Sequence, residues 1–141
     1  MSRANPFEKF LGIEDRLQIS CFQYAQMQFK GLLIHHSPNE GRRTPFEQYK
    51  IRQLGVKAGF PDFICFNNFQ TSNHDISTAY KYKGLAIEFK AIYKNGKKNT
   101  ETPEQIEWGG RLIDQGFFYT VITSFDDFKK LVDECYKHLR K

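Results

Sequence analysis

The chain has 141 residues, of which 40% are hydrophobic and 26% charged, a composition that suits one globular domain over residues 1–141. Lysine and arginine number 21 against 16 acidic residues, and the net charge of +5 favours a polyanionic partner such as nucleic acid. The first ten residues lack the apolar run of a signal peptide, no stretch reaches membrane-spanning length, and the three cysteines form no CxxC pair. We therefore expect an intracellular protein with no membrane segment, no disulfide framework and no zinc knuckle.

Helices and strands alternate in the first half of the chain. Apolar residues recur every three or four positions from residue 13 to about residue 30, which predicts an amphipathic helix. "GLLIHH" (31–36) predicts a strand, and Thr44 begins a second helix that Gly55 ends. "FPDFICF" (60–66) has the aromatic, β-favouring content of a strand, with its proline at the start, where no ladder hydrogen bond is missed.

The second half contains the most regular patterns. A polar stretch from residue 67 to about residue 79 leads to "YKGLAIEFKAIY" (82–93), which alternates as a second central strand. Thr102 as N-cap and Pro103 at the first helical position begin a helix that Gly116 ends. "FFYTVIT" predicts a strand, and Ser124 caps a last helix that runs to the end of the chain. The order predicts an α/β domain with a mixed sheet.

Three charged residues stand in the two central strands. Glu88 and Lys90 are two positions apart, so a strand projects both to the same face. Asp62 heads the preceding strand and can reach Glu88 across the sheet, since facing residues have Cβ atoms about 4.5 to 5.5 Å apart. Each piece alone is ordinary, because an exposed ExK is usually a solvated ion pair and Pro-Asp is usually a turn. Together, in otherwise apolar strands, these charges need a reason.

Metal-assisted hydrolysis is a chemistry that uses this set. Paired carboxylates repel each other in a dry site and become stable partners when a hard divalent cation such as Mg²⁺ lies between them. Such a cation polarises a phosphoryl oxygen. Lys90 is then placed to neutralise charge on a phosphate, or to orient or deprotonate an attacking water. The set therefore points to phosphodiester hydrolysis.

The blocks around these residues resemble a known family. "GVKAGFPDFICF", "GLAIEFKA" and "TPEQIEWGGRLIDQGFFYTVI" look like the successive blocks of the VRR-NUC domain, a branch of the PD-(D/E)xK nuclease superfamily. The resemblance runs from about Glu14 to Phe128. It implies a restriction-endonuclease-like core of order αβββαβ, with a central mixed β-sheet flanked by helices, and residues 1–12 as an N-terminal extension.

The resemblance also implies roles for the central residues. Asp62 and Glu88 would bind Mg²⁺ or Mn²⁺ together with the backbone carbonyl of Phe89, and Lys90 would be the catalytic lysine. In this family the first helix supplies a further acid, often followed four residues on by glutamine. Glu14 and Gln18 have that spacing here and share one helix face, although such residues are also ordinary in a first turn.

Other positions match the family less directly. Gln105 matches a helix glutamine near the active site, whereas Trp108, one turn later, is more typical of core packing. "HHSPNEGRR" resembles a turn with two glycines after the asparagine, and Glu40 replaces the first of them. The connection over residues 67–83, which holds His74 and Asp75, and the basic loop "KNGKKNTE" are both longer than in compact members. The residues predicted to contact DNA phosphates are Asn39, Arg42, Arg43, Lys94, Lys97 and Lys98, and solvated basic turns are the alternative.

We therefore expect a metal-dependent DNA endonuclease in the cytoplasm of a bacterial or phage-infected cell. The resemblance implies a homodimer that cleaves branched DNA such as four-way junctions. The alternative is a DNA-binding module without catalysis, which has no use for acids that face a polyanion. A histidine nuclease or zinc site is disfavoured, because the adjacent His35 and His36 face opposite sides of a strand. An organic nucleotide cofactor is not expected, since no GxGxxG or P-loop follows a strand.

Overall fold

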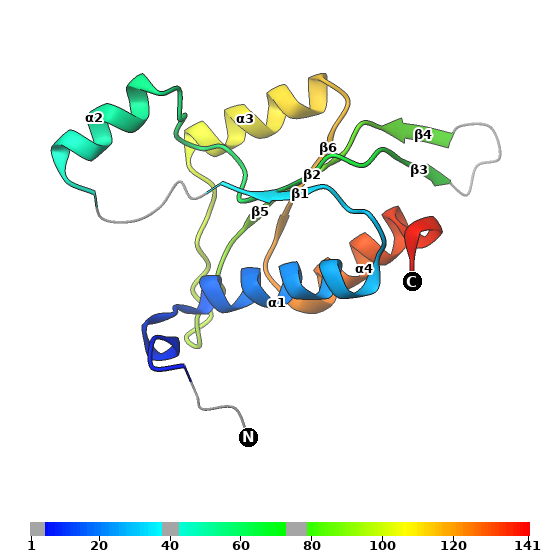
Figure 1. Cartoon of the computed structure of the whole chain (residues 1–141), viewed down its shortest axis with the longest axis horizontal. Coiled ribbons are helices and arrows are strands. Elements are labelled where there is room, and N and C mark those ends of the chain that lie inside the picture. The colour runs from blue at the N-terminus through cyan, green and yellow to red at the C-terminus, as the bar shows by residue number, and fades with distance from the viewer. Residues whose placement is uncertain (1–4, 38–42, 73–78) are drawn as a thin grey trace.

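The computed structural model describes residues 5–37, 43–72 and 79–141, and it contains a central four-stranded sheet (Figure 1). Its strands span Ile34–His36 (β1), Phe63–Cys65 (β2), Leu85–Phe89 (β5) and Phe118–Ile122 (β6). They lie in the order β1-β2-β5-β6. β2 runs antiparallel to both β1 and β5, whereas β5 and β6 run parallel, so the sheet is mixed, as the sequence predicts.

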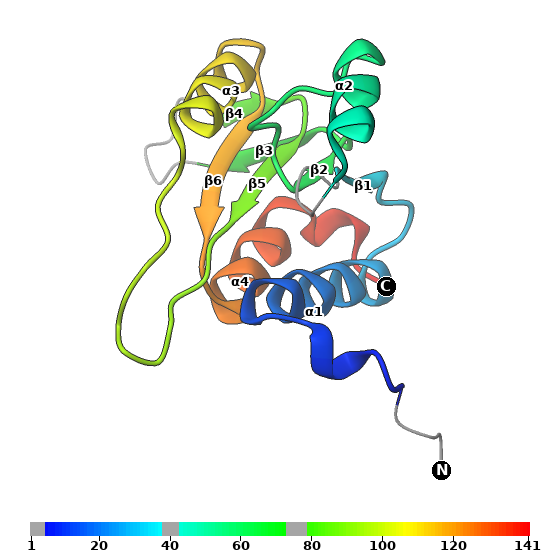
Figure 2. The ribbon, with the colours of Figure 1, turned by 90° about the vertical axis from the view of Figure 1, so that its left-hand side faces the viewer.

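Helices cover both faces of this sheet. Successive residues of β5 point to opposite faces. One face packs against α1 (Ile13–Gln28) and α4 (Phe125–Cys135), and α3 (Pro103–Asp114) lies on the other, where Glu88 points (Figure 2). The larger core, between the sheet and the first pair of helices, includes Cys21, Ala25, Phe63, Leu85, Ile87, Phe89, Phe128, Val132 and Tyr136.

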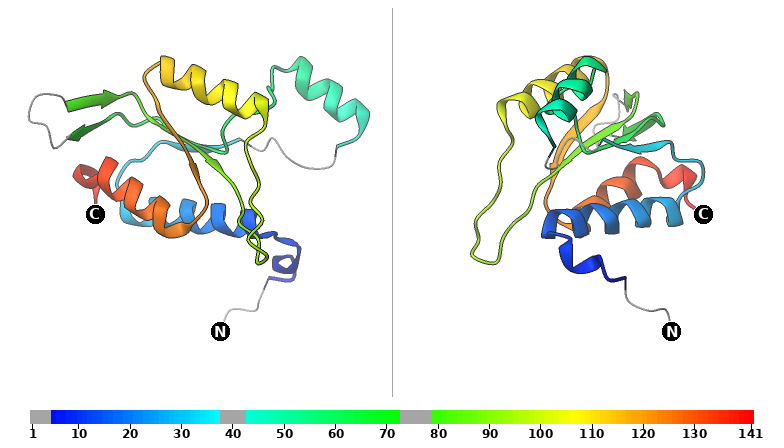
Figure 3. Two further views of the ribbon diagram at one scale, coloured as in Figure 1. Left: turned by 180° about the vertical axis from the view of Figure 1, so that it is seen from behind. Right: turned by 60° about the vertical axis from the view of Figure 1, so that its left-hand side comes forward.

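The helices begin at the N-cap residues that the sequence predicts. The side chains of Thr44, Thr102 and Ser124 each accept a hydrogen bond from a backbone N–H of the helix that follows. Gly116, just after α3, has a φ of +95°, which favours glycine. The helix begun at Thr44 is α2 (Pro45–Gln53), and it projects from the body with no buried residue (Figure 3).

The polar stretch between the two central strands is more ordered than predicted. It contains β3 (Phe69–Ser72) and β4 (Ala79–Tyr82), which pair as a second, antiparallel sheet. The register places Phe69 opposite Tyr82, and their rings stack with centroids 5.2 Å apart. Phe69 also meets Tyr136 edge to face at 5.4 Å. Aromatic packing, invisible in a mostly polar pattern, therefore supports these strands.

The first and last helices are shorter than predicted. Helix α1 ends at Gln28, and α4 ends at Cys135, where a 3-10 helix (Lys137–Leu139) follows. Beyond these ends Phe29 and Arg140 form an antiparallel bridge. The residues just beyond α1 and α4 therefore form sheet-like backbone hydrogen bonds with each other instead of continuing the two helices.

A 3-10 helix (Glu8–Phe10) precedes α1 within the predicted N-terminal extension. Over the described ranges, no helix is both long and apolar enough to cross a membrane.

Candidate active site

Asp62 and Glu88 are brought together by the pairing of β2 and β5. The antiparallel register joins Phe63 to Ile87, so the next position along places Asp62 opposite Glu88. Both side chains are buried, with exposed fractions of 4% and 1%. Two carboxyl groups thus share one water-poor position at the end of a strand pair.

Backbone contacts hold Asp62 in place. Its Oδ2 accepts a 2.9 Å hydrogen bond from the N–H of Phe89. Its carbonyl oxygen lies 2.7 Å from Nδ1 of His36, and since a carbonyl can only accept, this contact requires the proton on Nδ1. Burial raises the pKa of Asp62, while the Phe89 amide, the Glu88 carboxyl group, His36 and Lys90 act in the opposite direction.

Two nitrogen groups reach the same oxygen of Glu88. Nζ of Lys90 lies 3.6 Å from Glu88 Oε1, and the lysine side chain is only 8% exposed. Nε2 of Gln105 donates to this oxygen at 2.6 Å. Gln105 is fixed in turn, because its Oε1 accepts from the N–H of Thr102 at the N-cap of α3. The lysine and the glutamine therefore hold one carboxylate oxygen from two sides.

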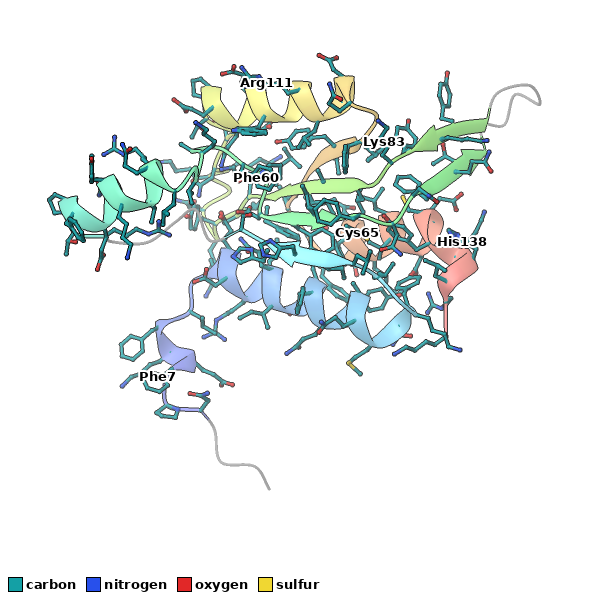
Figure 4. All side chains as sticks on the ribbon, turned by 45° about the horizontal axis from the view of Figure 1, so that its top comes forward. Phe7, Phe60, Cys65, Lys83, Arg111 and His138 are labelled. Carbon is teal, nitrogen blue, oxygen red and sulfur yellow. The ribbon has the colours of Figure 1, made fainter. Side chains whose placement is uncertain are left out.

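The loop before Asp62 depends on a close approach to α3. Gly59 has a φ of +86°, and a Cβ added there would lie 2.5 Å from the carbonyl carbon of Glu104. Phe60 lies beneath α3, and its ring meets Trp108 edge to face with centroids 5.1 Å apart (Figure 4). Glycine at this position thus lets the loop pass against the first turn of α3 and deliver Asp62 beside Gln105.

Glu14 and Gln18 lie nearby without joining the carboxylate pair. Oε2 of Glu14 accepts a 3.2 Å hydrogen bond from the N–H of Ala91, two residues beyond β5. Gln18 lines a hollow together with His36 and Asp62. Across the described ranges, no three histidine, cysteine, aspartate or glutamate side chains are grouped to hold a metal ion. A ligand role for Glu14 therefore stays a prediction.

Three hollows are lined by residues of the candidate site. One of about 580 Å³ lies at the start of α1 and reaches Lys90. A second of about 640 Å³ runs between α1 and His36, and Asp62 lines it. A third of about 220 Å³ lies between Gly59 and the first turn of α3, and Asp62 lines it too. Asp62 is therefore reached from two hollows and Lys90 from a third.

The predicted phosphate-binding residues divide into two groups. Lys94, Lys97 and Lys98 are exposed on a hairpin over residues 92–98, which we call the basic arm. Arg43 is half-buried just before α2. The remaining residues discussed for the turn and the long connection, which lie outside the described residues, are Asn39, Glu40, Arg42, His74 and Asp75.

Two contacts near the site are not predicted by the sequence. His36 contacts the backbone carbonyl of Asp62 through Nδ1. The hydroxyl of Tyr119 donates to Oε2 of Glu101, and burial, Glu101 and the two site carboxylates raise the pKa of Tyr119. Alternation on a strand predicts which face these residues take. It does not predict which partner lies opposite, so no local signal marks them.

The donor set suits a hard divalent cation. Asp62 and Glu88 offer carboxylate oxygens, the ligands that Mg²⁺ and Mn²⁺ prefer, and no soft sulfur ligand lies among the residues that hold them. Their shared burial also disfavours two negative charges without a cation between them. The residues present therefore fit such an ion.

The comparisons with known proteins concern the whole chain. The sequence matches no family model and no curated protein. The fold is similar to a solved structure described as a "VRR_NUC domain protein", with a TM-score of 0.64, 29% sequence identity, and 92% of each chain covered. That similarity confirms the nuclease-like α/β core that the sequence blocks predict. The similarity supports the assignment of the chain to the VRR-NUC family.

Proposed function

We propose that the protein is a divalent-metal-dependent endonuclease that hydrolyses phosphodiester bonds of DNA. The single observation that carries the proposal is the buried pair Asp62 and Glu88, facing each other across two strands with Lys90 Nζ 3.6 Å from Glu88. Similarity to a protein with a nuclease-domain name supports it.

Asp62 and Glu88 would hold Mg²⁺ or Mn²⁺, with the Phe89 carbonyl as the further ligand that the family resemblance implies. When bound, such an ion supplies an activated water and neutralises charge on the phosphate. Lys90 places an ammonium group beside the reacting phosphate, where it stabilises the charge that develops there. Gln105 orients the Glu88 carboxylate through its 2.6 Å hydrogen bond. Glu14 is proposed as an additional acid, supported by Gln18.

A module that only binds DNA fits these residues less well. Buried carboxylates at the centre of a surface that faces DNA repel phosphate, so they weaken binding unless a cation lies between them. The lysines of the basic arm and the net charge of +5 already supply affinity for the backbone. The acids therefore have a purpose in catalysis and none in binding alone.

Substrate and assembly form a second layer of the proposal. We propose that a homodimer cleaves branched DNA such as four-way junctions in the cytoplasm. This layer follows from the family resemblance, and the exposed lysines of the basic arm support it as a contact for the DNA backbone.

The test uses purified protein with linear duplex, single-stranded, closed circular and four-way-junction DNA in Mg²⁺ or Mn²⁺. We expect cleavage by the wild type, including of circular DNA, which separates an endonuclease from an exonuclease. Asp62→Asn should abolish cleavage while DNA binding and folding persist. Lys90→Met should slow cleavage by about 10² to 10³.

Matched controls are available on the surface. Asp114→Asn and Lys130→Met change an exposed acid and an exposed lysine that have no predicted role in the site, and neither should affect the cleavage rate as their buried counterparts do. If the wild type cleaves no substrate while Lys90→Ala binds DNA equally well, the protein is a binding module.

A further inference from the structure

We infer that the hollow between the basic arm and the start of α1 binds one unpaired nucleotide of the substrate, with the ring of Tyr93 stacked on its base. The inference rests on the proposed function, because it places this nucleotide next to the phosphate that Lys90 contacts.

The hollow has the size and walls of a nucleotide site. Its volume is about 580 Å³, within the usual range for small-ligand pockets. Residues 12–15 form one wall, and Tyr93 with residues 98–100 forms the other. The walls therefore combine an aromatic ring, an amide, a hydroxyl and a lysine, which are groups that recognise a base and its phosphates.

Lys90 connects this hollow to the candidate active site. It lines the hollow, is 6% exposed, and has its Nζ 3.6 Å from Glu88. A nucleotide in the hollow thus has one phosphate next to Lys90, which links the hollow to the carboxylate pair. Lys98, in the opposite wall, supplies a second positive charge for the phosphate on the other side.

The acids of the hollow hold its wall in place. Oε2 of Glu14 accepts from the N–H of Ala91, and Oδ2 of Asp15 accepts from the N–H of Gly12 at the start of α1. The first of these hydrogen bonds ties α1 to the base of the arm. Both acids thus stabilise the wall through backbone contacts.

The arm is a preformed hairpin. Tyr93 donates its backbone N–H to Lys97, and Gly96, with a φ of +79°, donates to the carbonyl of Tyr93, both at 2.8 Å. The hydroxyl of Tyr93 accepts from Nδ2 of Asn99 at 3.1 Å, and the residue is 40% exposed. A ring held in this way loses little freedom when a base stacks on it. Figures 2 and 3 show the arm beside the start of α1.

The ring selects an unpaired nucleotide. In a duplex, neighbouring bases cover both faces of each base, so a tyrosine inside a hollow can stack only on a base that has left the duplex. A lysine-rich arm without such a ring would bind duplex and single strands through phosphate alone. Tyr93 therefore distinguishes the two forms of DNA.

The test measures binding in EDTA, so that no cleavage occurs. The probes are a single-stranded oligonucleotide with one 2-aminopurine, whose fluorescence falls on stacking, and the same sequence as a duplex. We expect the wild type to quench the single-stranded probe. Tyr93→Ala should lose the quenching and bind that probe roughly 5- to 100-fold more weakly, with duplex affinity unchanged.

Two further variants sharpen the measurement. Tyr93→Phe keeps the ring and should retain the quenching. Tyr80→Ala removes an exposed tyrosine from β4, at the other end of the molecule, and should change nothing (Figure 1). Thermal unfolding of each variant checks that the fold persists.

The inference is overturned if Tyr93→Ala binds both probes as the wild type does, or weakens both equally. Its failure is distinct from that of the proposed function. If the wild type cleaves DNA and the Tyr93→Ala variant still quenches the probe, the nucleotide site is refuted and the nuclease proposal stands. If quenching depends on Tyr93 but the wild type cleaves no DNA, the nuclease proposal is refuted and the nucleotide site stands.

Discussion

Gln105 joins the N-terminus of α3 to Glu88: its Nε2 donates to Glu88 Oε1 at 2.6 Å while its Oε1 accepts from the N–H of Thr102 at 2.9 Å. One amide side chain thus completes a capping box and fixes a site carboxylate. The position of that carboxylate therefore depends on how α3 begins.

Substitution of Gln105 should separate these two roles. Glutamate at this position can also complete a capping box, but Gln105→Glu places a third carboxyl group against Glu88, so cleavage should fall while the helix persists. Gln105→Ala should lose both roles and destabilise the fold by about 1 to 3 kcal/mol. Thr102→Ala, the control, should cost about 1 kcal/mol from the cap and spare most activity. Urea unfolding measures the stability of each variant, and cleavage assays measure its activity. Full activity in Gln105→Glu would refute the proposal that Gln105 orients Glu88.

His36 should act through the Asp62 backbone. His36→Asn can place its side-chain amide near the position of Nδ1 and keep the 2.7 Å contact, so cleavage should stay within about twofold of the wild type. His36→Gln extends past that position, and loss of one hydrogen bond of about 1 kcal/mol corresponds to roughly fivefold slower cleavage. His35→Gln is the control on the same strand. Equal effects of the Asn and Gln variants would argue against this contact.

Metal binding should stabilise the fold through Asp62 and Glu88. At 100 times the dissociation constant, a bound ion adds about 2.7 kcal/mol to the free energy of unfolding, so Mg²⁺ or Mn²⁺ should raise the melting temperature. Asp62→Asn and Glu88→Gln should remove this response, whereas Asp114→Asn should keep it. Differential scanning calorimetry with and without EDTA measures the shift. An unchanged shift in both site variants would place the ion elsewhere.

Adjacent glycines in α3 should respond in opposite directions. A Cβ at Gly109 would lie within van der Waals radii of the Tyr119 ring, whereas one at Gly110 would meet nothing within 4 Å. Gly109→Ala should therefore destabilise the protein by about 1 to 3 kcal/mol through overpacking. Gly110→Ala should stabilise it by about 0.5 to 1 kcal/mol, because alanine favours a helix. Chemical denaturation of the two variants decides; equal effects would contradict the packing of Tyr119 against α3.

Asp133 should make stability depend on pH in the acid range. Burial alone would raise the pKa of Asp133. The hydrogen bond from the Tyr24 hydroxyl, at 2.6 Å, and the charges of Lys129 and Arg140 outweigh it and lower the pKa. A carboxyl group with a lowered pKa contributes stability above its unfolded value of about 3.9, and this is lost as pH falls through the folded value.

The substitution Asp133→Asn should therefore cost about 1 kcal/mol at pH 7, a value kept small because its ion-pair partners are well exposed. The difference from the wild type should shrink as pH falls below about 4. Glu134→Gln, which breaks an exposed ion pair with Lys137, is the matched control and should have little effect. A cost for Asp133→Asn that stays constant from pH 7 to pH 2 would contradict the lowered pKa.

Local pattern was sufficient for most of the helices and the four central strands. Caps at Thr44, Thr102 and Ser124 mark helix starts, because each hydroxyl needs only a backbone N–H three residues away. The second sheet was missed, because its support comes from Phe69 packing on the distant Tyr136.

The sequence by itself determined that Glu88 and Lys90 lie side by side, because residues two apart on a strand share a face. Only the tertiary structure decided what meets them. Gln105 reaches Glu88 across 17 residues, His36 reaches Asp62 across 26, and Glu14 reaches Ala91 across 77. Such contacts depend on strand register and on helix packing against the sheet, and both are set by the whole core, because a shift of one residue turns every side chain to the opposite face.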